Sequence, residues 1–198
     1  MNTALIVFVR NPVLGKVKTR IASTLGEDKA LSIYTKLLEH TCRVVRSAPA
    51  HVFVYYSDVI EPMDMWTDIA HARFVQQGDN LGDRMKNAFQ DLFDKGYTRV
   101  AIIGSDCFDL TPALLSEAIH CLDQNDFVIG PSEDGGYYLL GMRLFYPVLF
   151  NNKIWSTATV CMDTLRDIEK TNYSLYTLPL LSDVDTEEDC LKYNELIN

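Results

Sequence analysis

The chain has 198 residues, a length that suits one domain and allows about 70% of the unfolded surface to be buried on folding. Hydrophobic residues make up 47% of the chain and charged residues 23%, which is typical of a globular protein and argues against a disordered one. The net charge of -9 argues against a nucleic-acid-binding surface, which needs a basic footprint, but it allows a local basic pocket for a small phosphate ligand. We expect residues 1–198 to form a single domain.

The amino-terminal segment and the cysteines bear on where the protein acts. The apolar run over residues 3–9 is too short for a membrane span, and no charged region typical of a signal peptide precedes it. The five cysteines are odd in number, scattered, and never spaced as Cys-x-x-Cys. This usage favours reduced thiols over a structural zinc site, so we expect a cytoplasmic protein without a membrane span.

Hydrophobic periodicity predicts strands that alternate with helices along the chain. In chain order, the expected elements are a strand at 3–9, a basic loop at 10–20, a helix at 27–47, strands at 51–56 and 72–75, a helix from 81 to the glycine at 96, a strand at 99–103, a helix at 111–122, strands at 126–130 and 137–142, a helix at 157–170, a strand at 173–178 and a helix at 186–196. The strand at 137–142 has no crossover helix before it, which allows an antiparallel direction. This alternation predicts a three-layer α/β/α fold with a Rossmann-like, mostly parallel sheet.

Four cations directly follow the first predicted strand: Arg10, Lys16, Lys18 and Arg20. Backbone N–H groups in such a loop, together with Lys and Arg side chains, suit the phosphates of a nucleotide, and Arg20 could hold a phosphate bidentately. Neither a Gly-x-Gly-x-x-Gly fingerprint nor a Walker sequence is present, which disfavours classical NAD-binding and P-loop proteins. The alternative is a solvated basic loop without a ligand.

A carboxylate follows the strand at 99–103, in the sequence Gly104-Ser105-Asp106. Ligands of open α/β sheets collect beyond the carboxyl ends of the strands, so Asp106 is a candidate site residue. A carboxylate there could bind Mg²⁺, which takes one or two carboxylates and otherwise uses water and phosphate oxygens. The alternative is that Asp106 hydrogen-bonds the backbone of the following turn.

The turn between the strands at 126–130 and 137–142 contains a second candidate carboxylate, Asp134, followed by Gly135 and Gly136. Paired glycines permit positive φ or a close approach of the backbone to a ligand, and Asp134 could be a catalytic base or bind a hydroxyl. A tight β turn explains the same three residues equally well.

The segment before the last predicted helix is rich in acidic residues. Thr186 with Asp189 resembles a capping box, which explains the start of the helix without any chemistry. The capping box does not explain Asp183 and Asp185, one of which could complete a metal site with Asp106. Earlier in the chain, Trp155 could stack on a sugar, although an aromatic residue is more often part of the core.

Taken together, these segments resemble a known bacterial family, the glycosyltransferase-A-type radical-SAM/selenodomain-associated transferases of the nucleotide-diphospho-sugar transferase superfamily. The resemblance runs from about Val9 to the last helix, and its motifs in chain order are Arg10-Asn11-Pro12 with residues 15–20, Leu81-Gly82-Asp83-Arg84-Met85, Gly104-Ser105-Asp106, Asp134-Gly135-Gly136-Tyr137-Tyr138, Trp155-Ser156-Thr157 and Asp183-Val184-Asp185-Thr186.

The resemblance implies a nucleotide bound over the first loop and a divalent metal held by a carboxylate after a central strand. Lys16, Lys18 and Arg20 would then contact phosphate, and Asp106 would hold Mg²⁺ or Mn²⁺. The Asp-x-Asp-Thr segment is similar to the carboxyl-terminal motif of molybdenum-cofactor and phospholactate-type nucleotidyltransferases, where it lies near the metal, so Asp183 or Asp185 is the expected second ligand. The chain departs from the superfamily in two ways: its first loop lacks Leu-Ala-Ala-Gly, and Asp106-Cys107-Phe108 stands where glycosyltransferases have Asp-x-Asp.

Three functions compete on this basis. The first is a metal-dependent glycosyltransferase that uses a nucleotide sugar and a small-molecule acceptor, with Asp134 as the base. The second is a nucleotidyltransferase that joins an NTP to a phosphate- or carboxylate-bearing acceptor and releases pyrophosphate. The third is a nucleotide-binding module without turnover, because a fold by itself does not determine function.

Overall fold

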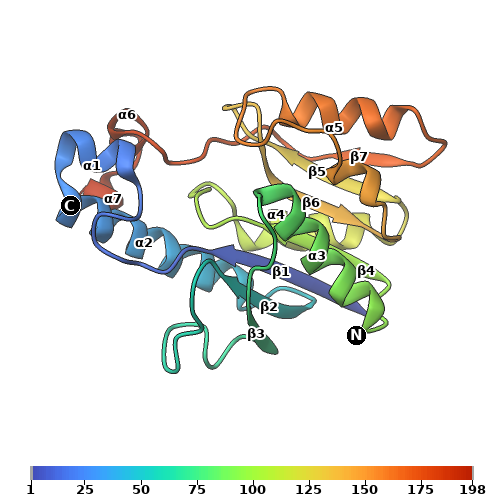
Figure 1. Ribbon diagram of the computed structural model, residues 1–198, viewed down its shortest axis with the longest axis horizontal. Coiled ribbons are helices and arrows are strands. Elements are labelled where there is room, and N and C mark those ends of the chain that lie inside the picture. Colours follow the sequence, from blue (N-terminus) through green and yellow to red (C-terminus); the bar gives the residue numbers. More distant parts are fainter. Residues whose placement is uncertain (1, 198) are drawn as a thin grey trace.

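A computed structural model describes residues 2–197, which form a seven-stranded sheet with helices on both faces (Figure 1). The strands are β1 (Thr3–Val9), β2 (His51–Tyr56), β3 (Ala72–Val75), β4 (Arg99–Ile103), β5 (Phe127–Pro131), β6 (Tyr137–Met142) and β7 (Leu175–Thr177). Their order in the sheet is β3-β2-β1-β4-β6-β5-β7. Strand β6 runs antiparallel to both of its neighbours, and the other pairs are parallel. The predicted α/β fold with a mostly parallel sheet is therefore confirmed.

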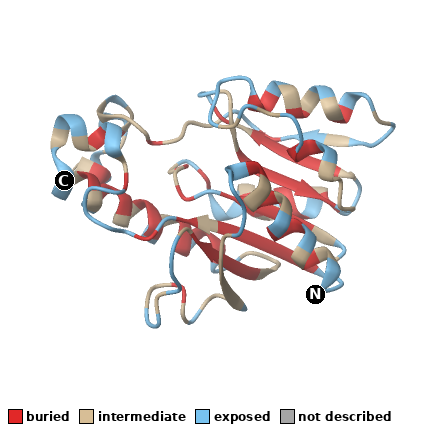
Figure 2. Ribbon diagram, viewed as in Figure 1, coloured by how far each residue is buried: buried red, intermediate tan, exposed pale blue. Residues whose placement is uncertain are grey.

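The helices lie in two layers that cover opposite faces of the sheet. They are α1 (Thr19–Leu25), α2 (Glu27–Val45), α3 (Leu81–Asp94), α4 (Pro112–Cys121), α5 (Val160–Glu169), α6 (Glu187–Leu191) and α7 (Asn194–Ile197), with a 3-10 turn η1 (Pro147–Phe150). Helices α2 and α4 pack on one face, and α3, η1 and α5 pack on the other. The strands between the layers are largely buried (Figure 2).

Strand β1 shows how the sequence produces the two layers. Its side chains alternate between the faces, so Leu5 belongs to the core under α2 with Leu37, and Ile6 belongs to the core under α3 with Phe89. All four side chains are essentially inaccessible to water. Burial of each such side chain stabilises the fold by about 1.5–3 kcal/mol before the loss of conformational entropy is counted. A run of apolar residues without alternation is what a strand covered on both faces requires.

Two helical regions differ from the prediction. Helix α1 was expected to be loop, and its start has no side-chain cap, because Lys18 precedes it in the left-handed conformation with φ 46°. The predicted helix at 186–196 is broken into α6 and α7. Short helices of this kind depend on tertiary packing rather than on local sequence signals.

Two of the three predicted helix N-caps are confirmed. Thr111 caps α4 and Thr186 caps α6, as the sequence indicates. Thr157 was considered as the cap of α5 and is not one: Thr159 precedes that helix, and the Thr157 hydroxyl donates instead to the carbonyl of Ile154 at 2.7 Å.

Across residues 2–197, none of the helices is both long enough and apolar enough to cross a membrane.

Candidate functional site

The topology brings distant parts of the chain to one edge of the sheet. The segments that meet there are residues 10–18 after β1, 104–106 after β4, 132–136 between β5 and β6, and 178–185 after β7. Because β6 is antiparallel, the turn that precedes it returns to the edge where the parallel strands end. Backbone hydrogen bonds join the segments: Val184 N–H donates to the Asp106 carbonyl, and Glu133 N–H donates to the Leu181 carbonyl, both at 2.9 Å.

Three carboxylates and one ammonium group form the centre of this edge. We call Asp106, Asp183, Asp185 and Lys18 the carboxylate cluster. Lys18 Nζ lies 2.8 Å from Asp106 Oδ1 and 2.9 Å from Asp185 Oδ1, and the lysine side chain is only 6% exposed. Burial lowers the pKa of Lys18, but the two carboxylates raise it more, so the pKa stays above its ordinary value and the group remains an ammonium ion.

Negative charge exceeds positive charge in the carboxylate cluster. Asp183 Oδ2 accepts a hydrogen bond from the Ser132 hydroxyl at 2.9 Å. Even so, burial and then the charge of Asp106 raise the pKa of Asp183 to about 7. Asp106 Oδ1 is buried, and the Lys18 ammonium, 2.8 Å away, is its charged partner.

The donor chemistry of the carboxylate cluster fits a divalent cation. Carboxylate oxygens are the ligands that Mg²⁺ prefers, and three carboxylates against one ammonium leave the charge that a divalent ion balances. Within residues 2–197, however, no three Asp, Glu, His or Cys side chains converge closely enough to hold an ion as they stand. Lys18 contributes to the separation of Asp106 from Asp185, because its ammonium lies between the two carboxylates.

Buried hydroxyl and amide groups lie next to the cluster, and no role for them was predicted. The Tyr34 hydroxyl of α2 accepts from the Arg10 N–H at 2.8 Å and lies 3.2 Å from the Ser105 hydroxyl. Burial and then the nearby Asp106 raise the pKa of Tyr34 to about 12, so it stays a neutral phenol. Asn11, 4% exposed, ties the first loop to the loop after β2 through its amide group. Tyr34 could be predicted only as a core residue, because it lies on the apolar face of α2.

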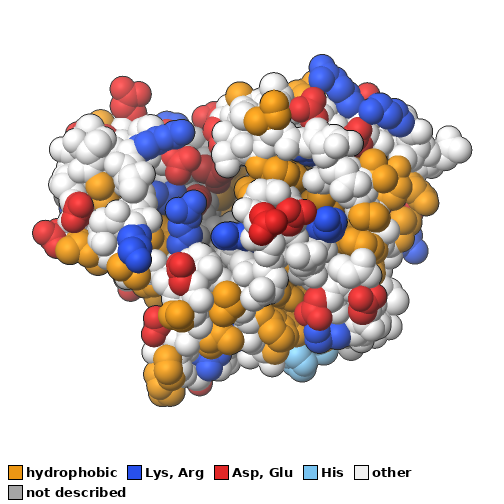
Figure 3. Space-filling view, viewed as in Figure 1, with side chains coloured by type: hydrophobic (Ala, Val, Ile, Leu, Met, Phe, Trp, Pro, Cys, Tyr) orange, Lys and Arg blue, Asp and Glu red, His pale blue; other side chains and the backbone are white. Residues whose placement is uncertain are grey.

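The other predicted phosphate-binding side chains face water. Arg10, Lys16 and Arg20 are exposed, in contrast to the buried side chain of Lys18. Figure 3 shows lysine and arginine side chains around a hollow between the lobe of α1 and α6 and the rest of the molecule, with acidic side chains beside them. The exposed cations are therefore free to reach a ligand that approaches this edge.

The turn with Asp134 has the geometry of an Asx turn. Asp134 is exposed, and its Oδ1 accepts from the Gly136 N–H at 2.9 Å. Gly135 has φ 86°, and a Cβ there would lie 2.0 Å from the Ala158 carbonyl oxygen. The close approach that the glycines allow is thus to a neighbouring segment of the chain. Asp134 also raises the pKa of Asp183, which places its charge close to the carboxylate cluster.

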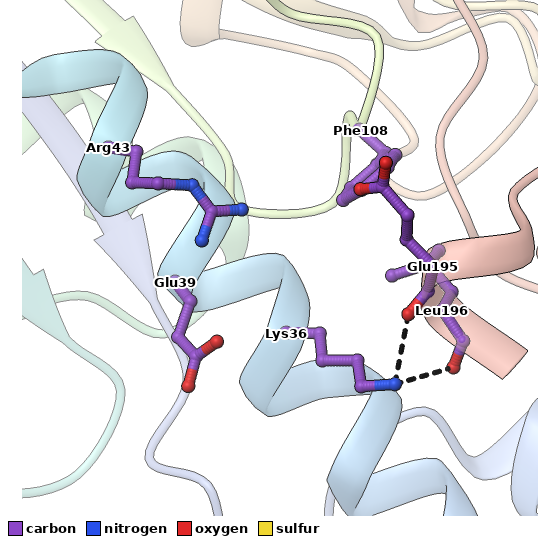
Figure 4. Close-up of a pocket in the computed structure, with 6 residues that line it drawn as sticks. All are labelled: Lys36, Glu39, Arg43, Phe108, Glu195 and Leu196. Atoms are coloured by element: carbon purple, nitrogen blue, oxygen red, sulfur yellow. Dashed lines mark hydrogen bonds between the residues drawn. The ribbon is translucent and has the colours of Figure 1, made fainter. Parts of the chain in front are cut away.

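A separate hollow of about 200 Å³ lies on the outside of α2, and it includes Phe108 of the loop after β4 (Figure 4). Lys36 points across it and donates to the carbonyls of Glu195 and Leu196 in α7, at 2.9 and 3.5 Å. Its ammonium is thereby used to hold the last helix. The charges of this hollow are mixed, and we assign it no chemistry.

Comparison with known proteins places this fold in a class. The chain has the fold of nucleotide-diphospho-sugar transferases and nucleotidyltransferases. It belongs to the DUF2064 family, described as an uncharacterised protein conserved in bacteria, which matches residues 39–157. No curated protein sequence matches it.

Solved structures support this assignment. A protein of Desulfovibrio desulfuricans G20, named provisionally as a nucleotide-diphospho-sugar transferase, is 33% identical, with a TM-score of 0.90 over 100% of this chain and 88% of that one. Rv0371c of Mycobacterium tuberculosis H37Rv, in complex with manganese, is 15% identical, with a TM-score of 0.55 over 98% of this chain and 97% of that one. The inositol-1-phosphate CTP transferase of T. maritima is 13% identical, with a TM-score of 0.57 over 100% and 95%. The latter two share the fold alone.

Proposed function

We propose that this transferase binds a nucleotide-activated donor at the carboxyl edge of the sheet, with Mg²⁺ or Mn²⁺, and moves a glycosyl group to a small acceptor. The observation that carries the proposal is the carboxylate cluster itself: Asp106, at the end of β4, lies with Asp183 and Asp185 around a single ammonium group, that of Lys18. Carboxylates gathered in this way repel one another, and a divalent ion is the ligand that balances their excess negative charge. The manganese complex of a protein with the same fold supports the choice of ion.

Each part of the site then has a role. Asp106, Asp183 and Asp185 would hold the divalent ion, which supplies positive charge to the diphosphate that leaves the donor. The exposed side chains of Arg10, Lys16 and Arg20 bind phosphate oxygens from the solvent side, where Arg20 can do so bidentately. Lys18 keeps the carboxylates together before the ligands arrive.

Asp134 is the proposed base for the acceptor hydroxyl. One of its oxygens is used by the Gly136 N–H, which fixes the direction of the carboxylate and leaves the second oxygen available to accept a proton. The side chain is exposed, as a group that must reach an incoming acceptor has to be. Gly135 and Gly136 serve the donor site by fixing this turn, Gly135 by its close approach to Ala158 and Gly136 by its hydrogen bond to Asp134.

Isothermal titration calorimetry with UDP, GDP and CDP tests the proposal, in buffer with Mn²⁺ and in buffer with a chelator. We expect one nucleotide to bind with Mn²⁺ and to lose at least about tenfold in affinity in the Asp106→Asn variant. Asp109→Asn is the matched control, because Asp109 lies on the same loop but contacts Tyr193 instead of the cluster. Binding no tighter than millimolar for all three nucleotides in both buffers would overturn the proposal.

A nucleotidyltransferase is the second candidate, favoured by the three exposed cations beside the cluster, because a triphosphate carries more charge than a nucleotide sugar. Pyrophosphate release from NTPs, across a panel of phosphate- and carboxylate-bearing acceptors, separates the two reactions. Release that requires both an NTP and an acceptor favours nucleotidyl transfer, whereas consumption of a nucleotide sugar favours glycosyl transfer. Nucleotide binding without turnover in either assay would instead indicate a binding module.

A further inference from the structure

Two sequence motifs that the proposed function leaves unused meet in one hollow. It has a volume of about 320 Å³, at the lower end of the range for small-ligand pockets, and lies between the start of α3 and the segment before α5. Most of its lining is polar: Asn80, Asp83, Asn151, Asn152, Lys153 and Trp155. The residues come from the Leu81-Gly82-Asp83 and Trp155-Ser156-Thr157 regions, more than 70 positions apart along the chain.

Trp155 forms one wall of the hollow, and Gly82 makes room for it. A Cβ at position 82 would lie 2.1 Å from Trp155 Nε1, so the indole edge packs directly against the backbone of α3. Trp155 is partly buried and packs against the core under α3, as expected of an aromatic residue, but part of its side chain remains accessible to solvent. A packed aromatic ring with an open side is a surface on which a ligand can stack.

The segment that carries Trp155 is fixed before any ligand binds. Asn152 and Ser156, on either side of Trp155, have φ 54° and φ 63° in the left-handed region. Such conformations persist only where the surroundings impose them, and they are common at ligand sites. Lys153, 2% exposed, forms an ion pair with Asp167 of α5 at 2.6 Å, which anchors the segment to the body of the protein. A site organised in this way loses little entropy on binding.

We propose that this hollow binds the glycosyl group of the reaction, a neutral ring rich in hydroxyls. Asn80 is already used to cap α3, but the amides of Asn151 and Asn152 can both donate and accept hydrogen bonds, as hydroxyl groups require. The indole suits the C–H face of a sugar. A phosphate does not fit, because the one lysine in the lining is already paired with Asp167. The inference rests on the proposed function and deepens it by naming where the sugar lies.

The segment that carries Trp155 also contacts the turn with the proposed base. Gly135 contacts Ala158 on the segment that leads from Trp155 to α5, and the Cys161 N–H donates to the Gly135 carbonyl at 2.9 Å. On its other side, the same turn reaches the carboxylate cluster through the hydrogen bond from Ser132 to Asp183. The turn with Asp134 therefore connects the segment that carries Trp155 to the carboxylate cluster.

Tryptophan fluorescence tests the inference directly, because the chain has two tryptophans and Trp66 is only 2% exposed. In a Trp66→Phe variant, Trp155 is the sole reporter. We titrate it with free glucose, galactose, mannose and N-acetylglucosamine, with UDP, GDP and CDP, and with the corresponding nucleotide sugars. A saturable change with a free sugar shows that the hollow binds the sugar ring itself, and a change with a nucleotide sugar but not with its nucleotide shows that it binds the sugar of the donor. Either result supports the inference.

Two outcomes overturn it. One is a change with a bare nucleotide as large as with its nucleotide sugar, which would make the hollow a nucleobase site. The other is no saturable change with any sugar ligand up to millimolar concentrations while calorimetry shows nucleotide binding. If no nucleotide binds, the proposed function fails, and the free-sugar titrations decide the hollow on their own.

Variants then assign the effect to Trp155, with binding read by saturation-transfer NMR because the variants lack the reporter. Trp155→Ala should weaken sugar binding about tenfold and leave Mn²⁺-dependent nucleotide binding within about twofold. Ile154→Ala is the matched control, since Ile154 is adjacent and 78% exposed. Asn151→Ala, at an exposed position, is the second test if Trp155→Ala folds poorly. Equal sugar affinity in Trp155→Ala, Asn151→Ala and the control would refute the assignment.

Discussion

Replacing Lys18 by methionine removes the ammonium from the carboxylate cluster and keeps a side chain of similar length. The wild-type ammonium lies 2.8 and 2.9 Å from two carboxylates whose side chains are 42% and 39% exposed. Loss of one partner of a fully buried pair costs about 3–5 kcal/mol, and an exposed pair contributes about 0–1 kcal/mol. Because water partly screens both carboxylates, we expect an intermediate loss of about 2 kcal/mol in the free energy of unfolding. At this chain length, that loss lowers Tm by about 4–8 °C.

Urea and thermal unfolding in buffer with a chelator measure this loss. Lys16→Met is the control, because Lys16 is on the same loop and exposed, and it should change the free energy of unfolding by less than about 0.5 kcal/mol. Lys18→Gly adds a second comparison. Lys18 has φ 46°, and glycine relieves about 1 kcal/mol of left-handed strain, so this variant should be more stable than Lys18→Met.

The same variant should also differ from the wild type in how strongly Mn²⁺ stabilises it. Without the ammonium, three carboxylates lack a counter-charge, so Mn²⁺ should raise the Tm of Lys18→Met more than the Tm of the wild type, by mass action on the folded state. Two results refute the reasoning: a Lys18→Met protein as stable as the Lys16→Met control, or a Mn²⁺-dependent rise in Tm that is no larger than in the wild type.

Three further predictions concern the surroundings of the site. Gly135→Ala should lower the free energy of unfolding by more than about 1 kcal/mol, because φ is 86° and the Cβ would lie 2.0 Å from the Ala158 oxygen; urea unfolding measures it. Asn11→Ala should cost about 1–3 kcal/mol in the same assay, since it removes the hydrogen bonds between the buried Asn11 amide and the backbone of Asp58 and Val59. Hydrogen bonds from the Ser174 N–H and hydroxyl lower the pKa of Asp126 below 3.8, so its contribution is complete above that pH and is lost as the pH falls through the lowered value. Asp126→Asn should therefore reduce Tm at pH 7 and flatten its fall below pH 4.

The sequence predicted the sheet well because most strands are apolar runs between clear turn residues. It predicted α4 from Thr111-Pro112 and the start of α6 from Thr186, where capping is local chemistry. It failed at α1, where the residue before the helix is Lys18 in a conformation that lysine seldom adopts. Nothing in the order of residues indicates that conformation, because the two carboxylates that hold the lysine come from positions far along the chain.

In the candidate site, too, some features could be predicted from the sequence and others could not. The sequence indicated that Asp106 and the Asp183–Asp185 segment belong together, and a backbone hydrogen bond from Val184 to Asp106 joins them in the structure. Their functional roles stay predictions. The burial of Lys18 among them was not foreseen, because in sequence Lys18 is one of four equivalent cations. Only the three-dimensional arrangement separates the one buried cation from the three that remain exposed.

The antiparallel strand β6 explains how the last acidic segment reaches its place. The pairing of β5 with β6 shifts register at Gly130 and Pro131, directly before Ser132, and such a bulge turns the following side chain in a new direction. Gly130 leaves space for the ring of Tyr138, because a Cβ there would lie 2.4 Å from Tyr138 Cζ. The Tyr138 hydroxyl then donates to the Pro179 carbonyl at 3.0 Å. Ser132 and Tyr138 thus hold the segment after β7 from two sides, so a parallel strand with a crossover helix at this position would leave Asp183 without its support.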